Sequence, residues 1–125
     1  MAICEESQLD PESTKVRTFT LTEAQGLLGK VRALTEEAVK RTDKLSVDMQ
    51  GLSQTDPAHV SAAKEFDEVI MAWTDKLRAM GLEVKGLWLV DFDNGEGYYC
   101  WKYPESTILH YHSYDEGFAG RIKIT

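Results

Sequence analysis

The feature that most constrains the fold is a change in the spacing of apolar residues near Gly86. Before Gly86, apolar residues recur at intervals of three and four, the period of an amphipathic helix. After it, runs rich in β-branched and aromatic residues follow a period of two, which is typical of strands. A helical half followed by a strand half predicts an α+β fold. With 125 residues, the chain is long enough to bury one core.

The first helix is expected over about residues 21–50. Thr20 and Glu23 have the spacing of a capping box, in which each side chain accepts a hydrogen bond from the other residue's backbone amide. Apolar residues then repeat every seven positions and mark one face of the helix. These residues are Ala24, Val31, Ala38, Leu45 and Leu52.

A second helix is expected over about residues 57–80, because Asp56 suits the N-cap and Pro57 the first helical position. Its apolar stripe alternates steps of three and four residues. The stripe consists of Ala63, Phe66, Ile70, Trp73, Leu77 and Met80. A short connection between two such helices predicts an antiparallel hairpin in which the two stripes pack against each other.

The second half is expected to form three or four antiparallel strands, over about residues 87–92, 96–103, 107–113 and 121–124. Asn94-Gly95 between the first two runs is a strong signal for a two-residue hairpin loop. The pairs that this loop predicts are Asp93 with Glu96, Asp91 with Tyr98, and Trp88 with Trp101. The expected fold is therefore a hairpin of two long helices packed on a small sheet, preceded by a disordered acidic tail over residues 1–17.

Both faces of the first two expected strands carry large apolar residues. One face carries Leu87, Leu89 and Cys100, and the other carries Trp88, Val90, Phe92, Tyr99, Trp101 and Tyr103. Because the helical hairpin can cover only one face, the second face is expected to expose aromatic surface. Exposed apolar surface usually marks an interface, so we expect a homodimer or another protein partner.

Composition argues against several other partners. Acidic residues outnumber basic ones by 21 to 14, for a formal charge of −7, and an acidic chain without a basic stripe repels phosphate groups. Neither nucleic acid nor an anionic membrane is therefore an expected partner. No apolar run approaches the roughly 20 residues of a membrane helix. The two cysteines, Cys4 and Cys100, form no disulfide framework and the first residues lack a signal-peptide pattern, which indicates the cytoplasm.

Two segments carry a family resemblance. The first is the run from Phe19 to Leu28. The second comprises Leu89-Val90-Asp91-Phe92, Cys100-Trp101-Lys102, Glu105, Ile108, His112 and Gly117-Phe118-Ala119-Gly120-Arg121. Over about residues 18–124 the chain resembles an uncharacterised bacterial family, domain of unknown function 2203. The resemblance implies a shared fold but no reaction. The chain departs from the family at Trp88 and Pro104, where the family usually has glycine, and at His110, where it favours an aromatic residue.

The polar residues of the second segment are Asp91, Glu105, His112 and Arg121. Asp91 is unusual because it lies between Val90 and Phe92 in a strand otherwise suited to burial, and a buried carboxylate needs a partner. A three-residue loop before the third strand would place Asp91, Tyr98 and His112 in one cross-strand row. A two-residue loop would move His112 to the opposite face. The sequence leaves both open, but we expect Asp91 to lie within reach of Tyr98, His112 or Arg121.

Three roles remain open for these residues: fixing the sheet through a polar network, binding a small molecule or anion through Arg121 and His112, and acid–base catalysis. Cys100 is not expected to be a nucleophile, because no neighbouring cation in the sequence lowers its pKa. His110 and His112 share a strand face and are candidate zinc or nickel ligands, but two ligands are too few, so neither a metal nor a cofactor is expected.

The sequence therefore favours a non-enzymatic homodimeric or partner-binding module. The alternative is a small ligand-binding protein or enzyme. The candidate binding residues of that alternative are Asp91, Tyr98, Glu105, His112 and Arg121.

Overall fold

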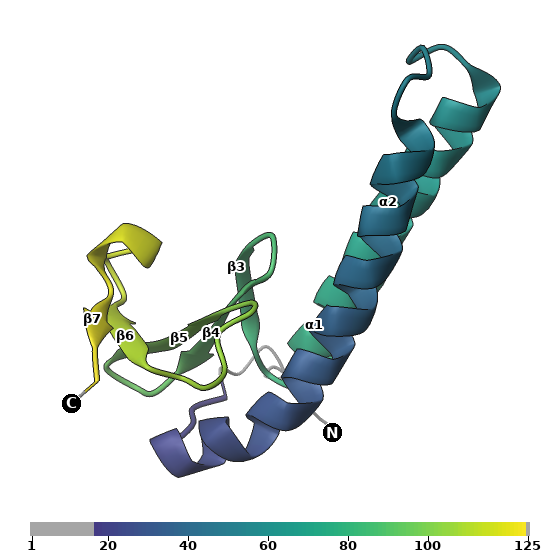
Figure 1. Cartoon of the computed structure of the whole chain (residues 1–125). Helices are drawn as coiled ribbons and strands as arrows, with labels where there is room; N and C mark the ends of the chain where they lie inside the picture. Colours follow the sequence, from purple (N-terminus) through teal and green to yellow (C-terminus); the bar gives the residue numbers. More distant parts are fainter. Residues whose placement is uncertain (1–16, 125) are drawn as a thin grey trace, which may run out of the picture.

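The computed structural model describes residues 17–124, so the expected acidic tail lies, apart from Arg17, outside the described residues. The element order is α1 (Leu21–Met49), α2 (Pro57–Ala79), β3 (Glu83–Gly86), β4 (Leu89–Asp93), β5 (Gly97–Lys102), β6 (His110–Ser113), the 3₁₀ turn η1 (Phe118–Gly120) and β7 (Ile122–Lys123). The predicted α+β fold of a helical hairpin followed by an antiparallel sheet is confirmed. Figure 1 shows the sheet beside the end of the hairpin where α1 begins, with the interhelical loop far from it.

Both helices begin where the sequence predicts. Thr20 Oγ1 accepts a hydrogen bond from the Glu23 amide at 3.1 Å, and Glu23 Oε1 accepts one from the Thr20 amide at 2.8 Å. At α2, Asp56 Oδ1 accepts a hydrogen bond from the Ala58 amide at 2.8 Å, and Pro57 is the first helical residue. These local caps satisfy amides that the helix itself leaves unpaired.

A seven-residue repeat forms the buried face of α1. Its buried residues are Ala24, Leu28, Val31, Thr35, Ala38, Thr42 and Leu45. Leu52, the last residue of the predicted repeat, lies beyond the helix and is half-buried. On α2 the buried residues are Val69, Trp73 and Leu77, whereas the predicted Ile70 is only half-buried. The buried face of α2 is therefore centred nearer to Val69 than the sequence predicts.

The sheet has five antiparallel strands in the order of the sequence, β3 to β7. The first strand, β3, was not predicted, because Glu-Val-Lys-Gly is short and half polar. The strands at the other end are shorter than expected, with β6 beginning at His110 rather than near residue 107.

The register of the β4–β5 hairpin differs from the predicted one by two residues. Asp93 pairs with Tyr98 and Asp91 pairs with Cys100. The loop residues are Gly95 and Glu96, with Gly95 at a φ of +92°. Glycine at the first of two loop residues suits a turn that follows the twist of the strands. A shift by two residues keeps every side chain on its face, so the predicted division into two faces is confirmed.

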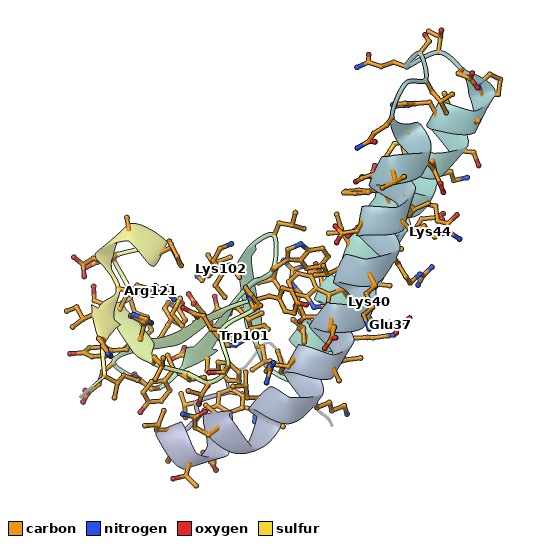
Figure 2. All side chains as sticks on the ribbon, viewed as in Figure 1. Glu37, Lys40, Lys44, Trp101, Lys102 and Arg121 are labelled. Atoms are coloured by element: carbon orange, nitrogen blue, oxygen red, sulfur yellow. The ribbon has the colours of Figure 1, made fainter. Side chains whose placement is uncertain are left out.

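The aromatic face of the sheet is the one that packs on the helices. Val90, Phe92 and Trp101 have no exposed surface, and the rings of Phe92 and Phe19 meet edge to face at 5.6 Å. In Figure 2, Trp101 lies on the helical side of the sheet, whereas Arg121 lies at the end away from the hairpin. The expectation of an exposed aromatic face is therefore wrong for the centre of the sheet, because that face is the covered one.

On the face of the sheet that packs on the helices, apolar side chains become more exposed toward the β7 edge. One cross-strand row runs from Phe92 through Tyr99 and Tyr111 to Ile122. Exposure along it rises from 0% at Phe92 to 40% at Tyr111 and 54% at Ile122. The reason is that the hairpin lies at the opposite end of the sheet from β7 (Figure 1).

Trp88 lies between β3 and β4 with a φ of +63°, in the left-handed region that strains any residue except glycine. This is a position at which the family resemblance leads us to expect glycine. The Trp88 indole meets the Trp73 indole edge to face, with ring centroids 4.9 Å apart. Aromatic packing against α2 thus offsets the backbone strain.

Candidate functional site

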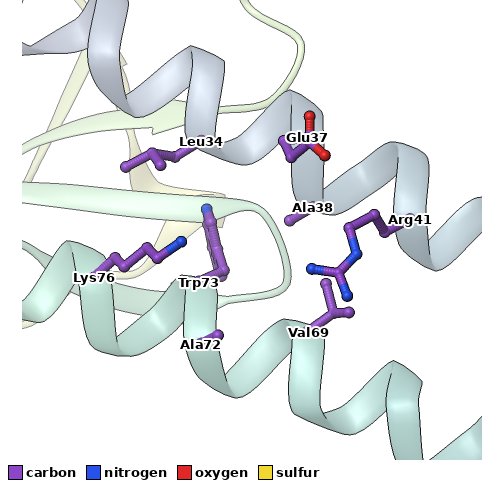
Figure 3. A pocket seen from close by; sticks show the side chains of 8 residues that line it. All are labelled: Leu34, Glu37, Ala38, Arg41, Val69, Ala72, Trp73 and Lys76. Carbon is purple, nitrogen blue, oxygen red and sulfur yellow. The ribbon is translucent and has the colours of Figure 1, made fainter.

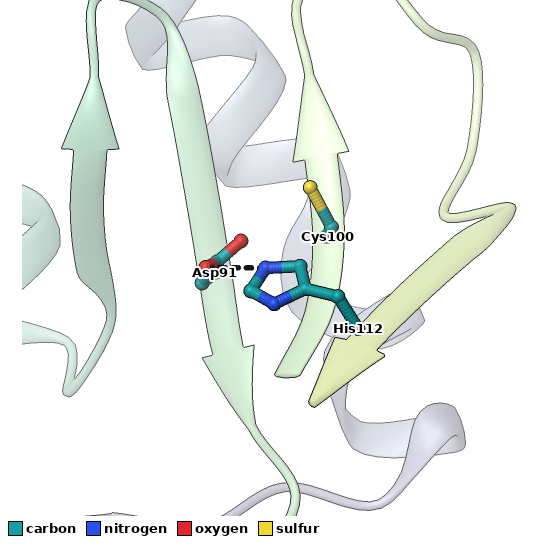
Figure 4. Close-up of side chains that lie close together, drawn as sticks. All are labelled: Asp91, Cys100 and His112. Carbon is teal, nitrogen blue, oxygen red and sulfur yellow. Dashed lines mark hydrogen bonds and ion pairs between the residues drawn. The ribbon is translucent and has the colours of Figure 1, made fainter. Parts of the chain in front are cut away.

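The sheet brings Asp91, Cys100 and His112 together on the face turned away from the helices (Figure 4). Asp91 in β4 pairs with Cys100 in β5, and His112 in β6 pairs with Tyr98. His112 Nε2 lies 2.9 Å from Asp91 Oδ2, and the two side chains are 3% and 1% exposed. The prediction that Asp91 has a partner among Tyr98, His112 and Arg121 is confirmed, and the partner is His112.

The pairing of His112 with Tyr98 is the one that the three-residue loop predicts, although β5 already ends at Lys102 and β6 begins only at His110. Gln25 of α1 holds the connection between β5 and β6: its Oε1 accepts hydrogen bonds from Thr107 Oγ1 at 2.7 Å and from the Ile108 amide at 3.3 Å. At the start of β5, a Cβ on Gly97 would overlap the carbonyl oxygen of His112. The close approach of β5 and β6 therefore requires glycine at this position.

Asp91 and His112 share a proton. His112 Nδ1 lies 2.9 Å from the carbonyl oxygen of Ser113, and since a carbonyl only accepts, Nδ1 carries a hydrogen. His112 Nε2 then faces the carboxyl group, so the pair is either imidazolium with carboxylate or neutral imidazole with carboxylic acid. Burial raises the pKa of Asp91, and the opposite charge of His112 acts against that rise.

The Cys100 thiol is fully buried beside this pair. Burial raises its pKa to about 12, and the nearby Asp91 carboxylate adds to the effect. Arg121 Nη1, 4.0 Å from Cys100 Sγ, acts in the opposite direction. The thiol is therefore protonated at neutral pH, which agrees with the expectation that Cys100 is not an activated nucleophile.

Glu105 and Arg121, the other two candidates, pair with each other. Arg121 donates two hydrogen bonds to the carboxylate, at 2.7 and 3.2 Å, and the Lys102 amide donates a third at 2.8 Å. Burial alone would raise the pKa of Glu105, but these hydrogen bonds hold it below its usual range. His110 Nδ1 is 3.7 Å from Glu105 Oε2. The predicted site residues thus form two neighbouring groups rather than one cluster.

A cavity of about 320 Å³ adjoins the Asp91–His112 pair. Its lining residues are Lys85, Leu89, Asp91, His112, Glu116, Gly117 and Phe118. Asp91 Oδ1 is buried and has no hydrogen-bond partner within residues 17–124. The sequence did not point to Lys85, Glu116 or Phe118 as site residues. Lys85 lies in the unpredicted strand β3, and only the folded sheet brings it close to Glu116 and Phe118.

A smaller cavity lies between the helices (Figure 3). Its volume is about 50 Å³, and its lining residues are Leu34, Glu37, Ala38, Arg41, Val69, Ala72, Trp73 and Lys76. This space holds no more than a few water molecules. A second cavity on the helices is as large as the one on the sheet, at about 320 Å³, and its lining residues are Lys30, Leu34, Lys76, Ala79 and Met80. We take the cavity on the sheet as the candidate site because it adjoins the buried Asp91–His112 pair.

The fold and the site together define a class: an α+β protein in which a helical hairpin supports a small antiparallel sheet with a buried carboxylate–imidazole pair beside a cavity. The chain belongs to the family described as uncharacterized conserved protein (DUF2203), whose model matches residues 17–124. No curated protein and no solved structure matched the chain in the corresponding comparisons. Neither helix in the described part of the chain has the length and apolar character needed to cross a membrane.

Proposed function

We propose that the protein binds a small ligand in the cavity beside Asp91 and His112, on the face of its sheet that is turned away from the helices. The observation that carries this proposal is Asp91 Oδ1, a buried acceptor without a partner among the described residues, in a side chain that lines the cavity. An unsatisfied buried acceptor costs about 1–3 kcal/mol. A ligand that brings a cation or a hydrogen-bond donor to Asp91 removes this penalty on binding.

The lining supports one kind of ligand chemistry more than others. Asp91 and Glu116 favour a cationic or donor group, while Leu89 and Phe118 offer an apolar surface to the rest of the ligand. Lys85 does not make this an anion site, because its Nζ lies 3.0 Å from Glu83 Oε1. The proton shared by Asp91 and His112 also makes acid–base catalysis on a bound ligand a second role for the same site.

Native mass spectrometry on protein taken directly from cells, together with a thermal-shift screen of small amines and metal ions, tests this proposal. We expect a bound mass above the 14.1 kDa of the chain, or a stabilising ligand, with the wild type. Leu89→Trp should remove binding because the larger ring fills the cavity. Met71→Trp, on an exposed position of α2, is the matched control and should retain it. Equal binding by both variants contradicts the proposal.

A second candidate function is that of a homodimeric module. It is supported by the exposed end of the cross-strand row that runs from Phe92 to Ile122. Tyr111 and Ile122 lie side by side on β6 and β7, and Leu109 nearby is 38% exposed. A second copy of the chain that packs on this patch would bury it. Light scattering should then give about twice 14.1 kDa for the wild type, and the monomer mass for Tyr111→Glu. A wild-type mass near 14.1 kDa at micromolar concentration excludes the dimer.

A further inference from the structure

We infer that Asp91, Cys100 and His112 bind a divalent transition-metal ion, with zinc as the best match, and that this ion is the cation of the proposed ligand site. The inference rests on the proposed function, because it specifies what occupies the space at Asp91. It differs from the sequence-based expectation of no metal, in which only His110 and His112 were considered as ligands.

The spacing of the donor atoms supports such a site. A sulfur, a ring nitrogen and a carboxylate oxygen from the three residues all lie within 4.8 Å of one another. Tetrahedral zinc, with bonds of about 2.0–2.3 Å, places its ligand atoms roughly 3.3–3.7 Å apart. The 2.9 Å separation of His112 Nε2 and Asp91 Oδ2 has to widen by less than about 1 Å for an ion to replace the shared proton.

The surroundings of His112 prepare it to be a ligand. Its Nδ1–H points to the carbonyl oxygen of Ser113 at 2.9 Å, which leaves Nε2 as the nitrogen that binds a metal. Nε2 faces Asp91, whose second oxygen is buried and without a partner among residues 17–124. A ring nitrogen able to bind a metal and a carboxylate with one unsatisfied oxygen thus lie together in a buried site that borders the cavity.

Charge balance supports the inference as well. With neutral His112, the Asp91 carboxylate and the Cys100 thiolate together carry the two negative charges that neutralise a divalent cation. Without a metal the thiol stays protonated, but a bound cation deprotonates a coordinating thiol. Arg121 Nη1, 4.0 Å from Cys100 Sγ, can then donate to the thiolate, while Glu105 neutralises the Arg121 charge at 2.7 Å.

Three protein ligands leave one position of a tetrahedral ion free. Asp91 and His112 both line the cavity of about 320 Å³, so this position is available to water or to a ligand molecule. Three protein ligands with one open position are the arrangement of zinc sites that bind or activate substrates, whereas structural zinc sites have four. The metal would therefore bind the small ligand rather than only stabilise the sheet.

His110 is not part of this site. It pairs with Cys100 across β5 and β6, but its Nδ1 lies 3.7 Å from Glu105 Oε2, in the group that holds Arg121. The structure thus separates the two histidines that the sequence grouped. His110→Gln is for this reason a matched control for substitutions at Cys100.

Titration with Co²⁺ tests the inference, because cobalt replaces zinc and gives a charge-transfer band in the near ultraviolet when a thiolate binds it. The experiment uses the full chain as Cys4→Ser, in which Cys100 is the one remaining thiol, after treatment with a chelator. We expect one Co²⁺ per chain, the thiolate band, and displacement by Zn²⁺. About two protons should be released per ion, one from the thiol and one from the Asp91–His112 pair.

Two variants and one protection measurement complete the test. Cys100→Ser should lose the band and at least tenfold in affinity, whereas His110→Gln should retain both. If Cys100→Ser does not fold, protection of Cys100 from a thiol reagent by Zn²⁺ takes its place. No stoichiometric binding, binding without the band, or loss of binding in folded His110→Gln overturns the inference. If no metal binds but the wild type still carries a Leu89→Trp-sensitive organic ligand, the proposed function stands without the metal.

Discussion

The indole nitrogen of Trp73 donates a hydrogen bond of 2.9 Å to Thr35 Oγ1 inside the helical hairpin, where both side chains are buried. Thr35 in turn donates to the carbonyl oxygen of Val31 at 2.7 Å. The apolar seam thus contains a fully satisfied polar chain. Trp73 also meets Trp88, so one residue joins α1, α2 and the start of the sheet.

Trp73→Ala is expected to lower the free energy of unfolding, measured with denaturant, by about 3–5 kcal/mol, since it removes a large side chain from the core.

Thr35→Val should lower the free energy of unfolding by about 1–3 kcal/mol, because it leaves the indole N–H buried without an acceptor. The double variant Thr35→Val/Trp73→Phe should lose less free energy of unfolding than Thr35→Val and Trp73→Phe lose in sum, because both single changes remove the same hydrogen bond. Denaturant unfolding of the wild type, the two single variants Thr35→Val and Trp73→Phe, and the double variant measures this coupling. Strictly additive losses would show that the hydrogen bond is unimportant.

Asp91→Ala is expected to destabilise the protein by about 3–5 kcal/mol, because it breaks a pair that is almost fully buried. Asp91→Asn should cost under about 1.5 kcal/mol, since its amide can donate to His112 Nε2 while Nδ1–H stays on Ser113. Thermal unfolding in metal-free buffer measures the difference. Equal losses for the two substitutions would mean that the contact with His112 contributes little.

Glu105 makes the stability of the protein depend on pH in the acid range. Its pKa is lowered in the folded state, so its contribution to stability is present above the ordinary glutamate pKa of about 4.3. That contribution is lost as the pH falls through the lower, folded value. Glu105→Gln should therefore cost about 1–3 kcal/mol at pH 7, and the difference from wild type should shrink below pH 4. Glu36→Gln, on an exposed glutamate of α1, is the control, and a difference that does not change with pH contradicts the prediction.

At position 88, substitution by glycine should destabilise the protein less than substitution by alanine, which reverses the usual order of these two residues. Both Trp88→Ala and Trp88→Gly lose the contact with Trp73, but only glycine relieves the strain of a φ of +63°. The glycine variant is therefore expected to be more stable than the alanine variant by about 1 kcal/mol. At Ala33, an exposed helical position, glycine should instead cost about 1 kcal/mol. Chemical denaturation measures both differences: glycine should give a more stable protein than alanine at position 88 and a less stable one at position 33.

The sequence by itself determined the elements whose signals are local. Thr20 with Glu23, and Asp56 with Ala58, fix the helix starts, because a cap involves residues only two or three positions apart. The alternation of β4 and β5 fixed which side chains share a face, since this depends only on the period of a strand. The same argument singled out Asp91 as a buried carboxylate in need of a partner, which is His112.

Only the tertiary structure decided the register and therefore the site. Alternation cannot distinguish registers that differ by two residues, because both place every side chain on the same face. The turn at Gly95 selects the register that sets Cys100, and not Tyr98, opposite Asp91. Hydrogen bonds to the side chain of Gln25, more than eighty residues away in the sequence, hold the segment that leads into β6. Contacts over such separations leave no periodic signal, so the cluster of Asp91, Cys100 and His112 exists only in the folded chain.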